Sequence, residues 1–560
     1  MSAATSHLSP PSTRLHLLPL SPPPLTSKAP HSRYCSFKDE LPHLKALVQW
    51  SGTVPAVSGK VPAMSWSGFN ELGGSAKEVE KVLARSEAVR PGHCATLIYT
   101  SGTTGNPKAV MISHDNIIYE SISAMDTLFA GRVGPKKLPN ELRIVSYLPL
   151  SHVAAQMLDI ATPMVVTALG YNGYGPSQFH KIWYTTWFAD ANALKGTLPA
   201  TLAAARPTAF LGVPRVWEKI REKLLEAGAK TKGPMKKLST FAKKHAVLAA
   251  KERQLGGSGK VTLGYVMSSW VLKIVKKKLG LDACIACLTA AAPMPREVAD
   301  YFASLDIDLL DVYGMSECTG ATTCSTGKLH QSGTVGGAIG PAEIKIDHVK
   351  GRDKPSEGEI CYRGRHIMLG YMKEPAKTAE AIDPDGWLHS GDVGMLDADG
   401  FLHITGRIKE LIITAGGENI APVPIEDKLK ELCPAISNVM MVGDKRKYNV
   451  CIITVKTVLD LDTNTSTGKL TGDALKVSSA TTDMMAISES KTAGSAWQKY
   501  LQGGIDTLNN KFSVSNAQKI QKFTVVPGDF SEKGGELTAT LKLKRNVTAD
   551  KYADVIDKMF

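Results

Sequence analysis

A loop of unusual composition follows a short apolar segment near residue 100. Ala95–Tyr99 is apolar and predicts a β-strand. The next six residues, Thr100–Gly105, are all Ser, Thr or Gly, and Asn106–Pro107–Lys108 completes the segment. Glycine permits positive φ and close approach of the backbone, so successive N–H groups can converge on phosphate oxygens, while hydroxyls add donors and Lys108 adds charge. The pattern predicts a phosphate-binding loop rather than a flexible linker.

This loop differs from the P-loop of many nucleotide-binding proteins. In GxxxxGK[ST] the lysine follows glycine and precedes Ser or Thr, whereas Lys108 lies between Pro107 and Ala109. The other Gly-Lys pairs are each followed by Val or Leu; they are Gly59–Lys60, Gly259–Lys260, Gly327–Lys328 and Gly468–Lys469. The sequence therefore contains no P-loop.

Composition places the chain among globular proteins. Of 560 residues, 43% are apolar and 21% are charged, values that exclude wholesale disorder and a collagen-like repeat. The length suggests about three or four compact units, or fewer large ones. The charge-free stretch Ile160–Phe179 contains two prolines and three glycines, whereas a membrane span needs about 20 predominantly apolar residues. We expect a soluble protein, with attachment to a membrane surface left open.

Basic residues outnumber acidic ones, 66 against 53, so the formal net charge is +13. This excess admits nucleic acid, anionic lipid or a polyphosphate ligand as partners. Lysines concentrate in 219–237, 243–251 and 273–278, but no zinc-finger or RNP pattern accompanies them, which argues against nucleic acid. Solvated helix faces explain these clusters best, and attraction to a membrane surface is the second explanation.

The nine cysteines show no spacing typical of a disulfide scaffold. Cys284 and Cys287 form the one C-x-x-C pair, and a structural zinc site would need a second ligand pair, which is not evident. Because free cysteine is often a core residue, we expect buried free thiols.

Residues 1–36 form a compositional block of their own. Seven prolines lie within Ser9–Pro30, and no acidic residue occurs before Asp39. The charge is typical of a transit segment, but the prolines forbid a continuous amphipathic helix, and an apolar secretory core is lacking. We predict a disordered, Pro-rich N-terminus, then globular structure from Phe37 onward, with a short buried strand at 44–48.

Further motifs follow the loop along the chain. They are Met111–Asn116, Ser146–Val153, Gly212–Lys219, Ala290–Pro293, Asp311–Glu317, Trp387–Asp392 and Gly406–Glu410. Together with the loop they resemble the adenylate-forming superfamily of acyl-CoA synthetases, luciferases and peptide-synthetase adenylation domains, from about Phe37 to Phe560. Within it, Leu150–Gln156 and Leu541–Arg545 are most similar to the bubblegum-type long-chain fatty acid–CoA ligases.

The resemblance implies an α/β fold with a large N-terminal domain of mixed sheets flanked by helices and a small, mobile α+β domain. It divides the chain into an AMP-binding domain, residues 37–408, and a small C-terminal domain, residues 409–560. Family members carry a further subdomain before the segment that matches Phe37, so we expect the first subdomain to be incomplete and the chain to be N-terminally truncated. Missing strands would expose apolar faces and an edge of the sheet.

The reaction implied by the resemblance joins a fatty acid to CoA in two halves. A carboxylate attacks the α-phosphate of ATP to give acyl-adenylate and pyrophosphate, and the thiol of CoA then displaces AMP. The carboxylate is already ionised at pH 7, so the protein must bring two anions together and neutralise charge rather than supply a general base. The expected ligands are ATP, Mg²⁺, CoA and a long-chain fatty acid, with no nucleic acid.

The same resemblance assigns the phosphates and the metal. The phosphates would be held by Thr100, Ser101, Gly102, Thr103, Thr104, Gly105 and Lys108. Glu317 and Thr104 would bind Mg²⁺, because a hard cation prefers oxygen ligands, and both are expected to act in catalysis.

It also assigns the adenine and the ribose. The adenine site would consist of Ala291, Asp311, Val312, Tyr313, Gly314, Met315 and Ser316. Tyr313 would stack on the base and Asp311 would contact its edge. Asp392, which precedes a hairpin-type turn at Asp397–Gly400, would accept hydrogen bonds from the ribose hydroxyls, assisted by Arg407.

Residues that act on the acyl group and on the domain motion are assigned in the same way. His152 would face the carboxylate and the adenylate at the acyl tunnel. Lys542 would bridge carboxylate and α-phosphate, but Lys544 would share a face with it in an extended segment, so the choice between them stays open. Lys409 would be the hinge about which the small domain swings between the half-reactions.

Two other functions stay open. A fatty-acyl adenylate-forming enzyme would not transfer the acyl group to CoA, and CoA-dependent release of AMP would distinguish it. A truncated, inactive nucleotide-binding relative would show no exchange between ATP and pyrophosphate. We expect a cytoplasmic location, with the surface of an intracellular membrane left open; the preferred chain length depends on tunnel depth, which is a tertiary property.

Overall fold

The computed structural model describes two units, one with described residues between 45 and 93 and one between 94 and 560. The described residues are 45–49, 54, 61–72, 76–100, 107–130, 139–172, 182–190, 192–257, 262–327, 329–416, 418–460, 465–478, 481–489, 495–538 and 542–560. The predictions for residues 1–36 and for Ser101, Gly102, Thr103, Thr104 and Gly105 lie outside them.

The smaller unit contains two strands and two helices. They are β1 (Leu47–Gln49), β2 (Ala63–Ser65), α2 (Trp66–Glu71) and α3 (Ala76–Ala88). β1 pairs with β2 in parallel, which confirms a strand at the end of the predicted segment 44–48. The prediction that this strand is buried is wrong, because all three β1 residues are half-buried. A two-stranded sheet is too small to cover its own faces.

Three parallel strands form the centre of the larger unit. Their five-stranded sheet contains, in spatial order, β11 (Gly337–Ala338), β10 (Thr323–Cys324), β9 (Leu309–Tyr313), β8 (Ala286–Ala290) and β7 (Ala209–Gly212). β7, β8 and β9 are parallel, while β10 and β11 are antiparallel. The segments after Gly212, Ala290 and Tyr313 therefore leave the sheet at one edge, which is where α/β sheets bind ligands.

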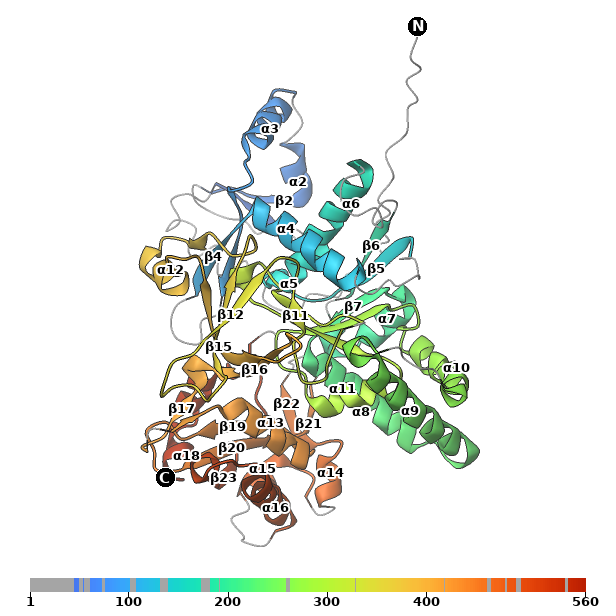
Figure 1. Ribbon diagram of the computed structural model, residues 1–560, viewed down its shortest axis with the longest axis vertical. Helices are drawn as coiled ribbons and strands as arrows, with labels where there is room; N and C mark the ends of the chain where they lie inside the picture. Colours follow the sequence, from blue (N-terminus) through green and yellow to red (C-terminus); the bar gives the residue numbers. More distant parts are fainter. Residues whose placement is uncertain are drawn as a thin grey trace. The chain divides into compact units, whose positions relative to one another are not determined.

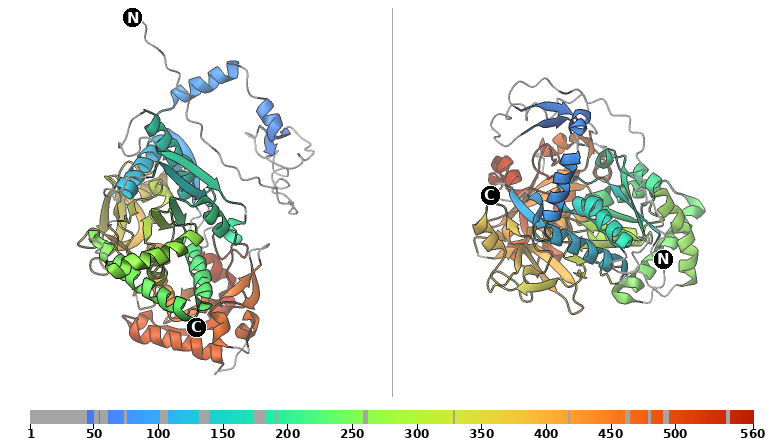
Figure 2. Two further views of the ribbon diagram at one scale, coloured as in Figure 1. Left: turned by 90° about the vertical axis from the view of Figure 1, so that its right-hand side faces the viewer. Right: turned by 90° about the horizontal axis from the view of Figure 1, so that it is seen from above.

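Helices pack on this sheet (Figure 1). They are α7 (Leu198–Ala205), α8 (Pro214–Ala229), α9 (Gly233–Arg253), α10 (Leu263–Lys278) and α11 (Arg296–Ala303). Aromatic contacts hold α8 and α11 in place, since the Trp217 ring lies 5.3 Å from the Phe210 ring and 5.0 Å from the Phe302 ring, edge to face. α9 and α10 pack side by side as a helical hairpin (Figure 2).

Two antiparallel sheets share a second core. One contains β14 (Gly370–Tyr371), β4 (Lys108–Ser113) and β3 (Cys94–Thr100), and the other contains β12 (Glu343–Asp347), β13 (Gly358–Arg363), β15 (Leu388–Leu396) and β16 (Leu402–Arg407). β3 confirms the strand predicted at Ala95–Tyr99. Ile98 and Val110 of the first sheet and Ile360 and Leu388 of the second are buried in one cluster. The strands that flank the predicted phosphate loop are thus anchored in a packed core.

The hairpin between β15 and β16 confirms the turn predicted at Asp397–Gly400. The Asp397 N–H donates to the Phe401 carbonyl at 3.0 Å, and the Gly400 N–H donates to the Asp397 carbonyl at 3.1 Å. A β-bulge between Val393 and Gly394 shifts the register set by this turn by one residue and places Asp392 opposite Arg407. Two residues that the sequence assigned to the ribose are therefore direct cross-strand neighbours.

A parallel pair of strands and further helices complete the part of the chain before residue 408. These elements are β5 (Glu141–Ser146), β6 (Trp183–Phe188), α4 (His114–Met125), α5 (Val153–Gln156), α6 (Thr162–Asn172) and α12 (Pro375–Ala381). Ser113 begins α4 with a capping box: its hydroxyl accepts from the Asn116 N–H at 3.0 Å, and the Asn116 side chain accepts from the Ser113 N–H at 2.8 Å. Among the described helices, none has the length and apolarity to cross a membrane.

The last part of the chain has its own core. Its elements are β17 (Ile412–Ile413), β18 (Asn419–Ile420), α13 (Pro422–Leu432), β19 (Ile436–Val442), β20 (Asn449–Val455), β21 (Thr457–Leu459), β22 (Ser466–Leu470), α14 (Ala474–Val477), α15 (Met484–Glu489), α16 (Ala496–Lys511), β23 (Ile520–Val525), α17 (Arg545–Lys551) and α18 (Ala553–Asp557). β20 is buried along its whole length, antiparallel to β19 and parallel to β23. In the described residues, the apolar clusters of 412–559 share no member with those of 98–402. The boundary predicted at Lys409 stays a prediction, since residues 94–560 form one compact unit.

The cysteine prediction holds for most of the described thiols. No described cysteine is in a disulfide, and six of the eight are buried. Cys284 is half-buried with its Sγ 3.5 Å from Sγ of Cys287. Cys94 is exposed, contrary to the prediction, because it begins β3 at the outer end of the strand.

Candidate active site

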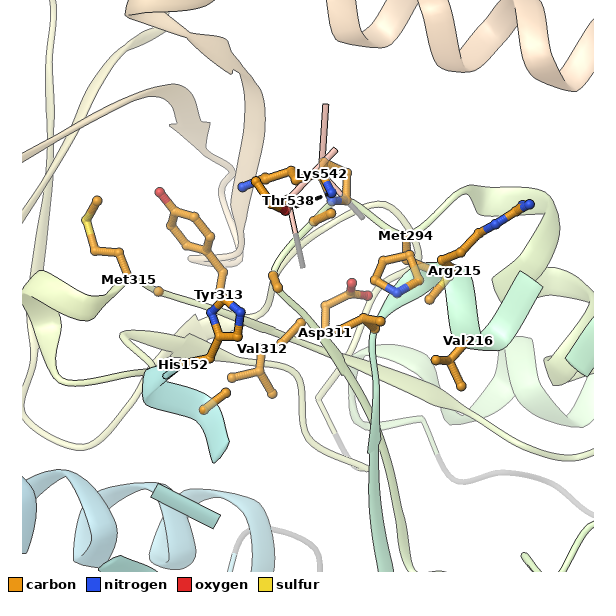
Figure 3. Close-up of a pocket in the computed structure, with 18 of the residues that line it drawn as sticks. His152, Arg215, Val216, Met294, Asp311, Val312, Tyr313, Met315, Thr538 and Lys542 are labelled. Carbon is orange, nitrogen blue, oxygen red and sulfur yellow. Dashed lines mark hydrogen bonds between the residues drawn. The ribbon is translucent and has the colours of Figure 1, made fainter. Parts of the chain in front are cut away.

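A cavity of about 2120 Å³ lies at the carboxyl edge of the parallel strands. Each predicted site residue that the structure describes lines it: Thr100, Lys108, His152, Ala291, Asp311, Val312, Tyr313, Gly314, Met315, Ser316, Glu317, Asp392, Arg407, Lys409 and Lys542. Figure 3 shows Tyr313, Asp311 and His152 together, with Lys542 on a separate segment from the end of the chain. The fold therefore gathers the predicted residues from both sides of Lys409.

The two ends of the predicted phosphate loop are held together. Thr100 pairs with Lys108 where β3 and β4 meet, so the two residues that flank the loop lie side by side. The Lys108 Nζ lies 4.5 Å from the centre of the Tyr371 ring, a cation–π contact. The Tyr371 hydroxyl donates a hydrogen bond to Glu317 Oε1 at 2.9 Å. A short chain of contacts thus joins the lysine of the loop to the predicted metal ligand.

Asp392 is held by two donors. Its Oδ1 accepts from Arg407 Nε at 2.7 Å, and its Oδ2 accepts from the Tyr313 hydroxyl at 2.5 Å. Burial first, and then the charge of Asp392, raise the pKa of Tyr313, so its hydroxyl stays protonated and donates. A carboxylate offers about four acceptor positions. Asp392 therefore retains acceptor capacity for ribose hydroxyls.

A strand irregularity presents Asp392 to the cavity. Against β13, Glu359 pairs with Val393 and Cys361 pairs with His389, so the β15 segment between these pairs is longer than its partner. Gly391, inside this bulge, has φ of +73°, which favours glycine. Bulges re-aim side chains and often occur next to active sites.

The backbone after β9 is tightly constrained. A Cβ at Gly314 would lie 1.9 Å from the Gly320 carbonyl oxygen, so glycine is required for this close approach. Ala291 has φ of +76°, a left-handed conformation that is rare without glycine and that clusters at ligand sites. Burial raises the pKa of Asp311 to about 7. The predicted adenine contacts would therefore rest on a rigid backbone.

His152 stands at the start of α5 and faces the cavity. Burial lowers the pKa of its imidazole, so the ring is neutral near pH 7. Its Nε2 is buried and makes no hydrogen bond to the described residues. A buried polar atom without a partner costs free energy, which a ligand in the cavity could recover.

Backbone contacts join Lys542 and Leu543 to Leu537 and Thr538. Leu537 pairs with Leu543, the Lys542 N–H donates to Thr538 Oγ1 at 3.0 Å, and the Thr538 N–H donates to the Lys542 carbonyl at 2.8 Å. The Lys542 side chain is exposed to the cavity, and its pKa is lowered by the loss of bulk water between the cavity walls and by Arg407.

Lys544 lines the same cavity and precedes helix α17 as its N-cap residue. Arg407 and Asp392 act on the charge of Lys542. The catalytic role of Lys542, and the choice between it and Lys544, stay predictions.

Two models of known families match the chain. The AMP-binding enzyme model matches residues 37–372, and the AMP-binding enzyme C-terminal domain model matches residues 409–471. The chain belongs to the AMP-binding enzyme family.

Relatives refine this membership. The long-chain-fatty-acid–CoA ligase ACSBG2 of Gallus gallus is 43% identical over 540 residues, which are 95% of this chain and 67% of the relative. The long-chain-fatty-acid–CoA ligase heimdall of Drosophila melanogaster is 38% identical over 552 residues, 94% of this chain and 77% of the relative. The predicted resemblance to bubblegum-type ligases is confirmed.

Solved structures of AMP-binding enzymes share the fold. The A domain of carboxylic acid reductase from Segniliparus rugosus, in complex with AMP and a co-purified carboxylic acid, has a TM-score of 0.62 at 18% identity and covers 94% of this chain and 73% of that chain. The o-succinylbenzoate CoA synthetase MenE from Bacillus subtilis, in complex with the acyl-adenylate intermediate OSB-AMP, has a TM-score of 0.53 at 18% identity, covering 92% and 80%. The predicted α/β adenylate-forming fold is confirmed.

Two residues of the cavity of this AMP-binding enzyme were not predicted from the sequence. One is Tyr371, which contacts both Lys108 and Glu317. The other is Glu120 on α4, which is buried and accepts a hydrogen bond from the Ala321 N–H at 3.0 Å. Each lies in a short polar or mixed segment without a chemical motif, so no local signal marks it.

Proposed function

We propose that this AMP-binding enzyme is a long-chain fatty acid–CoA ligase, which converts ATP, a fatty acid and CoA to acyl-CoA, AMP and diphosphate. Its relatives ACSBG2 and heimdall are named long-chain-fatty-acid–CoA ligases. The observation that carries the proposal is the meeting of three features on one cavity: the paired ends of the loop, the Tyr313–Asp392–Arg407 contact and Lys542. Such a cavity would hold a nucleotide with its phosphates toward a lysine of the small domain.

The first half-reaction would depend on charge placement. A carboxylate oxygen of the fatty acid forms a bond to the α-phosphorus, and the bond to pyrophosphate breaks, with the electron pair leaving on pyrophosphate. The Lys542 ammonium would lie between the carboxylate and the α-phosphate and offset the negative charge that accumulates there. The neutral His152 ring would add no charge beside the substrate carboxylate.

The residues present fit Mg²⁺. Glu317 is buried at the cavity wall, and its carboxylate takes its one described side-chain hydrogen bond from Tyr371. Carboxylate and hydroxyl oxygens are the ligands that Mg²⁺ prefers, and the ion would neutralise phosphate charge. Glu317 would hold it together with Thr104, which lies outside the described residues.

One wall of the cavity suits a hydrocarbon chain. It is lined by Met125, Leu142, Ile144, Leu158, Leu211 and Leu288. Each methylene buried there would contribute about 0.8 kcal/mol to binding. Burial raises the pKa of Glu120, on the same cavity, to about 8, so this side chain is mostly protonated at pH 7 and does not repel a fatty acid.

The test uses the purified chain with ATP, Mg²⁺, CoA and saturated fatty acids from medium to very long chain, with AMP and acyl-CoA measured. We expect AMP formation that depends on both CoA and fatty acid. AMP or acyl-adenylate formed without use of CoA would favour the adenylate-forming alternative. The non-catalytic nucleotide-binding alternative predicts that the parent chain shows no ATP–pyrophosphate exchange but still binds AMP, and that Asp392→Asn weakens this binding.

We also propose that the α9–α10 hairpin binds an anionic membrane surface. On α10 the apolar side chains Leu263, Met267, Trp270 and Ile274 are 61–80% exposed and recur at helical spacing, so they form one stripe. Met235, Leu238 and Phe241 of α9 are also exposed. The exposed lysines of the two helices are Lys236, Lys237, Lys244, Lys251, Lys273, Lys277 and Lys278. An apolar stripe beside lysines is typical of helices that lie in a membrane interface.

Vesicle sedimentation tests this surface. We expect binding to vesicles of phosphatidylcholine with phosphatidylserine, weaker binding to phosphatidylcholine alone, and loss of binding in Trp270→Glu. Val514→Glu is the matched control, because Val514 is 89% exposed and lies outside the hairpin. Equal binding of the Trp270→Glu variant and the control would refute the proposal.

A further inference from the structure

Four potential metal ligands meet on one face of the sheet that carries Asp392. Asp347 on β12 pairs with Glu359 on β13, and Cys361 on β13 pairs with His389 on β15. Glu359 and Cys361 are two residues apart on one strand, so their side chains point to the same face. One ligand atom from each of the four residues lies within 4.8 Å of the others.

The chemistry of these donors is specific. A thiol, an imidazole and two carboxylates are the ligand types of Zn²⁺, which favours four ligands, whereas Mg²⁺ and Ca²⁺ prefer oxygen alone. His389 Nδ1 lies 3.1 Å from Glu359 Oε2 and 3.5 Å from Cys361 Sγ. Its other nitrogen, Nε2, lies 3.6 Å from Asp383 Oδ2. A carboxylate behind a histidine is the usual partner that orients a metal-ligating imidazole.

The charges nearby also favour a cation. Lys345 Nζ is directed toward Asp383 at 3.9 Å and lies 4.8 Å from the centre of the Trp387 ring, so its charge is already partnered. Arg352 makes its ion pair with Asp353 at 2.7 Å. Four carboxylates, those of Asp347, Asp353, Glu359 and Asp383, thus lie near two cations, Lys345 and Arg352, and the charge of Arg352 acts on Asp347 and Glu359 as well as on Asp353. The carboxylates outnumber the cations, so the cluster retains an excess of negative charge.

We propose that Asp347, Glu359, Cys361 and His389 bind one zinc-class divalent cation. Binding would release the thiol proton of Cys361, because thiolate is the ligand form, while the proton of His389 would reside on Nε2, toward Asp383. In the ion-free arrangement, hydrogen bonds among His389, Glu359 and Cys361 hold the same side chains together. The cluster is thus preformed for the cation.

The cation site is connected to the nucleotide site. The second oxygen of Glu359, Oε1, accepts from the Gly391 N–H at 2.9 Å, within the bulge that presents Asp392. A cation that fixes Glu359 and His389 would fix both ends of this segment. This consequence rests on the proposed role of Asp392 in binding the ribose, whereas the cation site itself does not.

Metal binding is measured on protein freed of metal by dialysis against a chelator. Equilibrium dialysis with Zn²⁺ should give one tight site, and Co²⁺ should give a sulfur-to-cobalt charge-transfer band. Cys361→Ser should abolish the band, and Asp347→Asn should weaken Zn²⁺ binding by about 10–100-fold. Asp347→Asn changes a half-buried residue, so it keeps the test valid if Cys361→Ser, in the buried core of the sheet, does not fold.

Two variants serve as controls. His403→Gln changes a histidine of the neighbouring strand β16, which is 2.9 Å from Asp397 but has no thiol partner. Cys287→Ser removes the other close thiol pair, whose Sγ atoms are 3.5 Å apart. Both should keep the tight site and the cobalt band. Loss of the band in Cys287→Ser but not in Cys361→Ser, or no tight Zn²⁺ binding in the parent, would overturn the proposal.

The connection to the nucleotide is measured separately with AMP, after free zinc is removed by dialysis. We expect the zinc-loaded chain to bind AMP about fivefold or more tightly than the metal-free chain, and Asp347→Asn to show no such difference. Equal AMP affinity of the two forms would overturn the connection. Because no step of this test uses catalysis, failure of the proposed ligase activity would leave its result intact.

Discussion

Tyr371→Phe separates the two contacts of Tyr371. The ring, and with it the 4.5 Å cation–π contact to Lys108, is retained, whereas the 2.9 Å hydrogen bond to Glu317 Oε1 is lost. A hydrogen bond to a charged group contributes about 1.5–3 kcal/mol. Loss of a partner that orients a metal ligand typically costs about 10–100-fold in metal affinity or activity, which is the same range of free energy. We therefore expect the Mg²⁺ concentration for half-maximal adenylation to rise about 10–100-fold.

The assay is ATP–pyrophosphate exchange at a fixed ATP concentration over a series of Mg²⁺ concentrations. Binding of ATP without Mg²⁺, measured by calorimetry, should change little, because Lys108 keeps its aromatic neighbour. Tyr448→Phe is the matched control: its hydroxyl lies 2.9 Å from the Met559 carbonyl oxygen and 2.8 Å from a terminal carboxylate oxygen of Phe560, and it can donate to either one. This control should lower stability without a change in the Mg²⁺ dependence.

A double variant tests whether Tyr371 acts on the metal through Glu317. If Tyr371 acts through Glu317, Tyr371→Phe should add little to a Glu317→Gln variant, since residues that act as a unit are not additive. An unchanged Mg²⁺ midpoint in Tyr371→Phe, or fully additive losses in the double variant, would refute the assignment of Glu317 to the metal by way of Tyr371.

Three further variants test other parts of the site. Lys542→Ala should slow adenylate formation by about 10²–10³ but spare thioester formation from supplied acyl-adenylate, and equal losses in separate half-reaction assays would contradict this. Lys409→Pro should do the reverse, because a fixed φ blocks the hinge, and normal CoA transfer would remove Lys409 from that role. The folded-state pKa of Glu120, about 8, exceeds its unfolded value. The contribution of Glu120 to the free energy of unfolding is therefore complete below pH 4.5 and is lost as the pH rises to 8. Glu120→Gln should remove up to about 5 kcal/mol of that decline in denaturant titrations, and an unchanged pH dependence would show that Glu120 is not buried in its neutral form.

Local patterns predicted two elements that flank the candidate site. The strand at Ala95–Tyr99 and the turn at Asp397–Gly400 depend on neighbouring residues, and both are present. The register of the turn alone would place Asp392 opposite Gly406, and a β-bulge between Val393 and Gly394 shifts it so that Asp392 lies opposite Arg407. The local pattern therefore predicted the hairpin but not this pair.

Contacts between distant segments were not predictable in the same way. Tyr371 is 54 residues from Glu317, and Glu120 is 201 residues from Ala321. Glu120 lies on α4, where Ile118 is half exposed and polar residues such as Asn116 are buried, and its carboxylate contacts the segment after β9 through the Ala321 N–H. A carboxyl group becomes a strong acceptor or a neutral acid according to such packing, which no spacing along the chain encodes.

The cluster at Asp347, Glu359, Cys361 and His389 shows why spacing rules miss a site of this kind. Rules for zinc motifs count ligands along a single turn or helix, and such a count selects Cys284 and Cys287. In an antiparallel sheet, proximity is set by register, and here the register changes at the bulge around Gly391. Without the extra length of β15, a residue other than His389 would face Cys361. The irregularity that directs Asp392 into the cavity therefore also creates the four-ligand cluster, so the two sites share one structural cause.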